Sequence, residues 1–145
     1  MVVYKTGVWD LFHVGHLNVL SIAAGLGSFL VVGVATDEYA SSYKSQPPAI
    51  SFHDRIRIIS ELRSVDAVVP YHATGDMQPV EIFGVNLRVV DEQFACGDSS
   101  LAEKQRQAKH VMEEAGVRFV IVPRTPGIST AQTRKEICLS EKSSS

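Results

Sequence analysis

Five short apolar runs, most of them rich in valine and without polar alternation, divide the chain. The runs are Val2–Lys5, Phe29–Ala35, Ala67–Pro70, Leu87–Val90 and Arg118–Val122. Strands that are buried on both faces have this character, because a strand with one solvated face alternates apolar and polar residues. The runs therefore predict the strands of a parallel sheet.

Helix-like patterns separate the predicted strands. They cover Gly15–Gly25, a stretch from Ser51 to Arg63, Gln78–Phe83, Ser100–Ala115, and a stretch that begins at Ser129. This alternation requires right-handed crossovers, so the sequence predicts an α/β fold: a Rossmann-like, doubly wound, five-stranded parallel sheet with helices on both faces. Such sheets bind ligands beyond the carboxyl ends of their strands.

The length of 145 residues fits one domain, which we expect over residues 1–140, with a flexible tail at 141–145. The net charge is -2, so the chain lacks the excess of basic residues that is typical of proteins that bind duplex nucleic acid or a membrane surface. We find no signal-peptide pattern and no apolar run that could span a bilayer. The two cysteines, Cys96 and Cys138, form no ligand spacing or disulfide framework. We therefore expect a cytoplasmic protein.

Two histidines open the first predicted helix, after the first strand and a turn that begins at Gly7. His13 and His16 are three residues apart and share one helical face, and Gly15 between them lets a phosphate approach the backbone. The amino end of a helix suits phosphate, and imidazoles add hydrogen-bond donors without a permanent charge. Histidines with no joint role are an equally weighted interpretation of this motif alone.

A second polar segment, residues 124–130, follows the last strand and opens the last predicted helix. Arg124 can fork onto phosphate oxygens, and Ser129 and Thr130 can cap the helix or bind a phosphate. Taken alone, such a segment is more often an ordinary helix cap. Because this segment and the His13 loop both leave carboxyl ends of predicted parallel strands, we expect them to face one crevice.

With both segments in view, the chain resembles the HxGH nucleotidyltransferase superfamily, and most closely its cytidylyltransferases of the glycerol-3-phosphate cytidylyltransferase group. The matching segments, in the family's order, are Gly7–His16, Ala35–Glu38, His53–Arg55, Arg63–Asp66 and Arg124–Thr130. Val8 and Trp9 stand where the family usually has threonine and phenylalanine, and Val90 with Asp91 replaces a glycine–aspartate pair. The resemblance implies the HUP-type fold of this superfamily.

The resemblance also implies an enzyme that transfers CMP from CTP to a small phosphorylated alcohol and releases pyrophosphate. In this interpretation His13 and His16 donate to the phosphates, Lys44 closes over the triphosphate from a mobile loop, and Arg124 holds the β- and γ-phosphates. Mg²⁺ is the expected cofactor, held mainly by substrate phosphates and water rather than by protein ligands. The expected partners are CTP, the phosphorylated acceptor and a second copy in a homodimer.

Further residues are implied to line the nucleotide site. They are Gly7, Val8, Trp9, Asp10, Gly15, Arg63, Asp91, Thr125, Ile128, Ser129 and Thr130. From the residues alone, Arg55 and Arg63 are equally compatible with a solvated face or a salt bridge, and Asp10 with an internal turn role. Asp37 and Glu38 are compatible with a place at a helix start.

Two other functions stay open at the level of sequence. One is adenylyl transfer by a sister enzyme that resembles FMN adenylyltransferase. The other, motivated by Val8 and Val90, is a nucleotide-binding protein with weakened chemistry.

Overall fold

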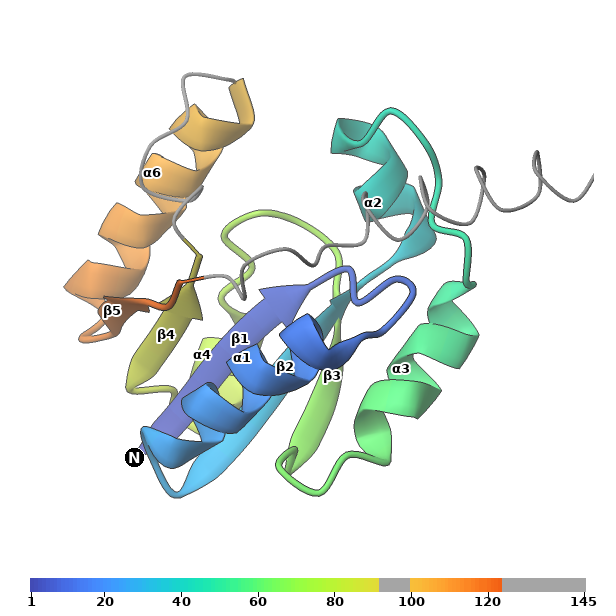
Figure 1. The fold of residues 1–145 in the computed structure, drawn as a ribbon. Coiled ribbons are helices and arrows are strands. Elements are labelled where there is room, and N and C mark those ends of the chain that lie inside the picture. The colour runs from blue at the N-terminus through green and yellow to red at the C-terminus, as the bar shows by residue number, and fades with distance from the viewer. Residues whose placement is uncertain (92–99, 124–145) are drawn as a thin grey trace, which may run out of the picture.

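Five parallel strands form one sheet in the order β3-β2-β1-β4-β5 (Figure 1). The computed structural model describes residues 1–91 and 100–123. The strands are β1 (Val2–Gly7), β2 (Phe29–Ala35), β3 (Ala67–Tyr71), β4 (Leu87–Val90) and β5 (Arg118–Ile121). Every pairing is parallel. The predicted strands and the predicted fold class are confirmed.

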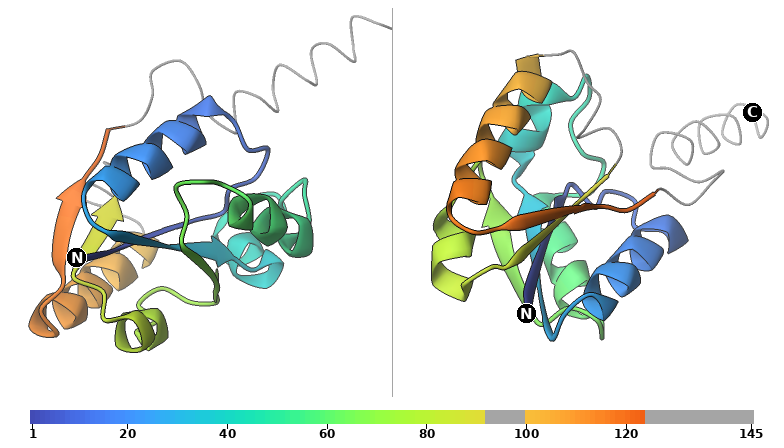
Figure 2. Two further views of the ribbon diagram at one scale, coloured as in Figure 1. Left: turned by 90° about the horizontal axis from the view of Figure 1, so that it is seen from below. Right: turned by 90° about the vertical axis from the view of Figure 1, so that its left-hand side faces the viewer.

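Helices cover both faces of the sheet. They are α1 (Val14–Gly25), α2 (Asp37–Tyr43), α3 (Phe52–Ser60), α4 (Gln78–Phe83) and α6 (Ser100–Glu114). Leu20 of α1 and Ile59 of α3 pack against one face, while Val80 of α4 and Met112 of α6 pack against the other. Figure 2 shows α1 and α4 on opposite sides of the sheet. The helix predicted from Ser129 and the tail at 141–145 lie outside the described residues.

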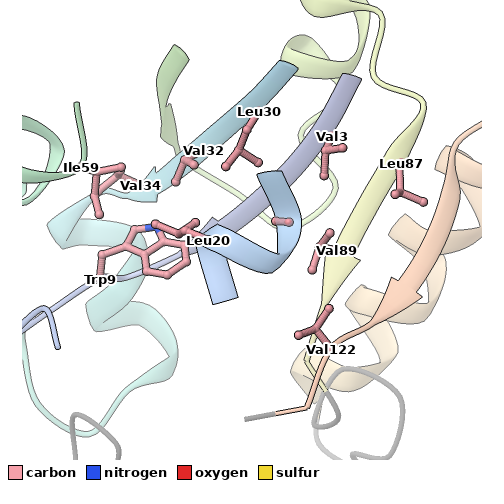
Figure 3. Close-up of a cluster of buried hydrophobic side chains, with 11 residues drawn as sticks. Val3, Trp9, Leu20, Leu30, Val32, Val34, Ile59, Leu87, Val89 and Val122 are labelled. Atoms are coloured by element: carbon pink, nitrogen blue, oxygen red, sulfur yellow. The ribbon is translucent and has the colours of Figure 1, made fainter. Parts of the chain in front are cut away.

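The larger core cluster lies between the sheet and the helices α1 and α3 (Figure 3). Its strand residues come from β1, β2 and β4, including Val3, Val32 and Val89, which are all fully buried. Trp9 from the loop after β1 completes this layer, and its indole Nε1 donates to the Gly33 carbonyl oxygen at 3.0 Å. The core therefore extends up to the carboxyl edge of the sheet and supports the loop there.

The strand order reverses beside β1. The connections that contain α1 and α3 lead from β1 to β2 and on to β3, whereas β4 lies on the other side of β1. In open α/β sheets this point of reversal, at the carboxyl ends of the strands, is where ligands bind. The loop that carries His13 leaves β1 at this point. Within residues 1–91 and 100–123, none of the helices has the length and apolar character needed to cross a bilayer.

Candidate active site

Two imidazoles cap the amino end of α1. His13 is the N-cap residue, with extended backbone angles, and its Nδ1 accepts a hydrogen bond from the Gly15 amide at 3.0 Å. His16, three residues on, accepts with its own Nδ1 from the His13 amide at 3.3 Å. This is the reciprocal arrangement of a capping box, in which two side chains each satisfy an amide of the first turn. The spacing of the histidines therefore serves the helix start directly.

The caps determine which ring nitrogen of each histidine carries the proton. An imidazole nitrogen that accepts a hydrogen bond is unprotonated, so each neutral ring carries its hydrogen on Nε2. The two rings stack with their centroids 3.9 Å apart and their planes inclined by 15°. The Nε2 of His13 is buried and has no hydrogen-bond partner within the described part of the chain. A buried donor of this kind suits an oxygen of a bound ligand.

Both histidines are held neutral. Burial lowers the pKa of His13 below its usual 6.5. Burial also lowers the pKa of His16 to about 4, with smaller contributions from His13 and from the positive charges of Lys44 and Lys5, and Asp10 opposes them. At neutral pH the pair therefore offers hydrogen-bond donors without charge.

The free energy of unfolding is expected to fall as the pH is lowered from about 6.5 towards 4. The unfolded chain binds a proton at His16 near pH 6.5, whereas the folded chain resists protonation down to about pH 4. In this window the unfolded state binds more protons, so stability rises with pH and levels off above about pH 7.5. Urea unfolding across this range measures the effect. The variant His16→Gln should lose part of the slope, and an unchanged slope would contradict the assignment.

Three predicted nucleotide-binding residues support the loop with their side chains. Trp9 is buried in the core beside His16, with the ring centroids 5.5 Å apart, and Val8 packs against Ala35. The buried carboxylate of Asp10 accepts from the amides of residues 49 and 50 at 2.8 and 2.9 Å. Each of these side chains is engaged inside the fold, and a contact of this loop with the nucleotide stays a prediction.

Gly7 makes room for the indole of Trp9. A Cβ atom at Gly7 would lie 2.7 Å from Cε2 of Trp9, which is closer than side chains approach one another. Trp9 itself has a φ of 59°, a left-handed conformation that is costly for a bulky residue. The turn after β1 is thus fixed by the fit of Trp9 against Gly7, and Gly7 lies directly before the histidine loop.

Arg55 joins four segments beneath the site. Its side chain is fully buried, its Nε donates to the Ile50 carbonyl at 2.8 Å, and its Nη1 donates to the carbonyls of Val8 at 2.6 Å and Ala35 at 2.8 Å. Its Nη2 pairs with the carboxylate of Asp37 at 2.6 Å. Of the alternatives open for Arg55, the salt bridge is the one present, and the predicted place of Asp37 at a helix start is confirmed.

Two lysines lie near the histidines. Lys44 is the C-cap residue of α2, and its positive charge contributes to the lowered pKa of His16. Lys5 in β1 acts on His16 in the same way, and its ammonium lies 6.0 Å from the centroid of the Trp9 ring. Sequence reasoning missed Lys5, although a lysine within a buried strand was the available signal. The structure thus brings two cations to the paired histidines.

Two other predicted residues lie at the same edge. Gly15 is buried and gives its amide to His13. Asp91 directly follows β4, the neighbour of β1, and so lies beyond the carboxyl end of that strand. A nucleotide contact by either residue stays a prediction.

Arg63 lies at the opposite edge of the sheet. It follows α3, which runs from the carboxyl ends of the strands back to the amino end of β3. Nearby, the Asp66 carboxylate accepts from the Leu30 amide at 2.7 Å, at the beginning of β2. Within one chain, Arg63 is therefore separated from His13 by the length of the sheet, and its contact with the nucleotide stays a prediction.

The predicted phosphate-binding segment after β5 stays a prediction. It lies outside the described residues. Its members are Arg124, Thr125, Ile128, Ser129 and Thr130.

The structure is a doubly wound sheet with a histidine-capped helix at its point of reversal, and comparison with known proteins places it in the nucleotidyltransferase class. The model of the family described as cytidylyltransferase-like matches residues 4–137, and the chain belongs to this family. It is 32% identical over 131 residues to glycerol-3-phosphate cytidylyltransferase of Bacillus subtilis (strain 168), covering 90% of this chain and 92% of that protein.

Larger proteins share the same segment. The chain is 31% identical over 141 residues to ethanolamine-phosphate cytidylyltransferase of Dictyostelium discoideum, covering 94% of this chain but 37% of that protein. It likewise matches 34% of the ethanolamine-phosphate cytidylyltransferase of Arabidopsis thaliana, at 32% identity over 97% of this chain. The chain thus spans about a third of these longer relatives.

Solved structures agree with the fold. The lipopolysaccharide core biosynthesis protein of Thermoplasma volcanium GSS1 superposes with a TM-score of 0.65 at 29% identity, covering 86% of this chain and 96% of that one. Thermotoga maritima TmcAL, solved with alpha-thio ATP, reaches a TM-score of 0.65 at 14% identity, covering 97% of this chain and 51% of that one, and shows the fold alone.

Proposed function

We propose that the chain is a cytidylyltransferase that transfers CMP from CTP to a small phosphorylated alcohol. The observation that carries the proposal is the pair of neutral imidazoles at the amino end of α1, each with its proton on Nε2. Donors fixed in this way stabilise the negative charge that grows on phosphate oxygens during transfer, and they need no rearrangement to do so. Membership of the cytidylyltransferase-like family supports the same reaction.

In the proposed reaction, a phosphate oxygen of the acceptor attacks the α-phosphorus of CTP. The bond between that phosphorus and the bridging oxygen to the β-phosphate breaks, and pyrophosphate leaves with the electron pair. His13 and His16 donate to the reacting phosphates, and Lys44 and Lys5 add positive charge beside them. The reaction requires alignment and charge stabilisation and no covalent intermediate with the protein.

The proposal includes Mg²⁺, a homodimer and a cytoplasmic location, where CTP is supplied. Within the described part of the chain, no group of three or more metal-binding side chains is arranged to hold an ion. We assign Mg²⁺ to the triphosphate, because Mg²⁺ is usually bound through substrate phosphates and water, so that the proposed substrate is the magnesium complex of CTP. Three apolar side chains of α1, Val14, Leu17 and Ile22, are exposed and support a second copy as a partner.

Glycerol 3-phosphate is the first acceptor that we propose, and ethanolamine phosphate is the second. The names of relatives similar over nearly the whole of this chain support both. The two compounds share a phosphate monoester and differ in the charge of the remainder.

Two measurements test the proposal. In thermal unfolding, CTP with Mg²⁺ should raise the midpoint, since a ligand at 100 times its Kd stabilises a fold by about 2.7 kcal/mol, and ATP should not match it. Radiolabelled CTP incubated with each acceptor should then yield a CDP-linked product and pyrophosphate. Stabilisation by ATP alone would favour adenylyl transfer. Tight CTP binding without turnover on any acceptor would favour a nucleotide-binding protein.

A further inference from the structure

Arg88 is a buried cation on the face of the sheet opposite α1. It belongs to β4 and is 5% exposed. Its Nη2 donates to Oγ1 of Thr6 at 2.6 Å, and its Nη1 donates to the Val89 carbonyl at 3.3 Å. Among residues 1–91 and 100–123, no carboxylate comes within 4.0 Å of its guanidinium. Buried arginines normally have an anionic partner, so this charge is available to an anion.

Tyr4 provides a second polar group without a partner on the same face. It is the cross-strand neighbour of Arg88, it is fully buried, and its ring centroid lies 4.9 Å from the guanidinium carbon. Its hydroxyl has no hydrogen-bond partner among the described residues and lies over Gly33 of β2, where an added Cβ would come within 2.8 Å of it. Burial raises the pKa of Tyr4 well above its usual value, so the hydroxyl stays a neutral donor. Among the described residues, this face of the sheet thus holds a guanidinium without an anionic partner and a hydroxyl without a hydrogen-bond partner.

The guanidinium is directed towards the carboxyl edge of the sheet. Arg88 pairs with Tyr4 across the strands, but its Nη2 reaches Thr6, two residues nearer the carboxyl end of β1. The capping histidines lie beyond that same end of β1, at the start of α1, which covers the other face. Arg88 and the histidines therefore flank the end of one strand from opposite faces.

Transfer at phosphorus requires this kind of two-sided arrangement. The attacking oxygen and the leaving oxygen lie roughly in line, on opposite sides of the α-phosphorus. With the α-phosphate at the histidines and the leaving pyrophosphate on the side of α1, the acceptor approaches from the other face, where Arg88 and Tyr4 lie. Arginine recognises a phosphate with two parallel hydrogen bonds.

We propose that Arg88, together with the hydroxyl of Tyr4, binds the phosphate of the phosphorylated acceptor. The assignment of that ligand rests on the proposed function, whereas the prediction that an anion binds at Arg88 does not. In the competing interpretation, Arg88 only holds β1 and β4 together through Thr6 and the ring of Tyr4.

Thermal unfolding with glycerol 3-phosphate, in the absence of any nucleotide, separates the two interpretations. The midpoint of the wild-type protein should rise with the ligand. Arg88→Met should lose this rise, whereas Arg106→Met, which removes an exposed arginine of α6, should retain it. An equal rise in Arg88→Met and the wild type, or no rise in the wild type, would overturn the proposal.

A milder variant tests the same site in case Arg88→Met does not fold. Tyr4→Phe keeps the aromatic ring under the guanidinium and removes only the hydroxyl. It should weaken the binding of glycerol 3-phosphate about tenfold, which is the usual size of one hydrogen bond to a charged group. Unchanged binding would remove Tyr4 from the site and overturn the paired assignment.

Kinetics then identify the ligand as the acceptor. Arg88→Met should raise the KM for the acceptor at least tenfold and leave the KM for CTP within about twofold. A fall in kcat alone, or an equal rise in both KM values, would overturn the proposal. A wild-type protein that binds glycerol 3-phosphate through Arg88 but turns over no CTP would refute the proposed function and leave the anion site standing.

Discussion

The variant His16→Ala is expected to lower kcat for CMP transfer by about 10² to 10³, the usual cost of removing one fixed donor from a developing negative charge. The loss should be mainly in kcat, because the Nε2 hydrogen of His16 is proposed to act most strongly as charge grows on the phosphates. Pyrophosphate release with CTP and glycerol 3-phosphate measures it.

The variant His16→Gln serves as the matched control for folding. A glutamine at this position keeps an acceptor for the His13 amide, in the manner of an ordinary capping box. Its unfolding free energy should therefore stay within about 1 kcal/mol of the wild type, while its turnover falls as in His16→Ala. Turnover within about threefold of the wild type in both variants would remove His16 from the chemistry.

The variant Arg55→Met should reduce the free energy of unfolding by about 3–5 kcal/mol. It leaves the carbonyls of Val8, Ala35 and Ile50 without their donor, in a region closed to water. The Asp37 carboxylate contributes less to this loss, because its side chain is 45% exposed and can be solvated. Urea unfolding followed by circular dichroism measures the change.

Arg57 provides the comparison for Arg55. It lies two residues further along α3, with its side chain exposed, so Arg57→Met should change the unfolding free energy by no more than about 0.5 kcal/mol. Equal effects of the two substitutions would show that the buried contacts of Arg55 contribute little to stability.

The sheet could be predicted because burial on both faces leaves a simple pattern. The runs at Phe29–Ala35 and Leu87–Val90 contain no polar alternation except one arginine, and both strands have the predicted bounds. The paired histidines were equally visible, since they follow directly on the first strand. What sequence could not supply was their function as a mutual helix cap, which depends on the orientation of the rings.

The missed features depend on contacts between distant segments. Helix α2 has the sequence DEYASSY, without a clear apolar stripe, and it is anchored by the Thr36 hydroxyl at its start and by the Asp37–Arg55 ion pair. Arg55 is compatible in sequence with a solvated position, because arginine is rarely buried. Its site exists only where carbonyls from the loop after β1, from β2 and from the loop before α3 converge.

Arg63 illustrates the difference between a motif match and a position in the fold. Its neighbours in sequence match a family motif, but a helix that follows a parallel strand returns the chain to the other end of the sheet. The topology therefore places Arg63 away from the histidines of its own chain, and its contact with the nucleotide stays a prediction.

The contact between Gly7 and Trp9 constrains how this protein can diverge. Any side chain at position 7 collides with the indole, so that position can accept a larger residue only after position 9 has accepted a smaller one. Trp9 in turn holds the backbone of β2 through Gly33 and lies edge-on to His16. Substitutions at these two sites are therefore coupled in their order, because the space that a side chain at position 7 needs is the space that the indole now fills.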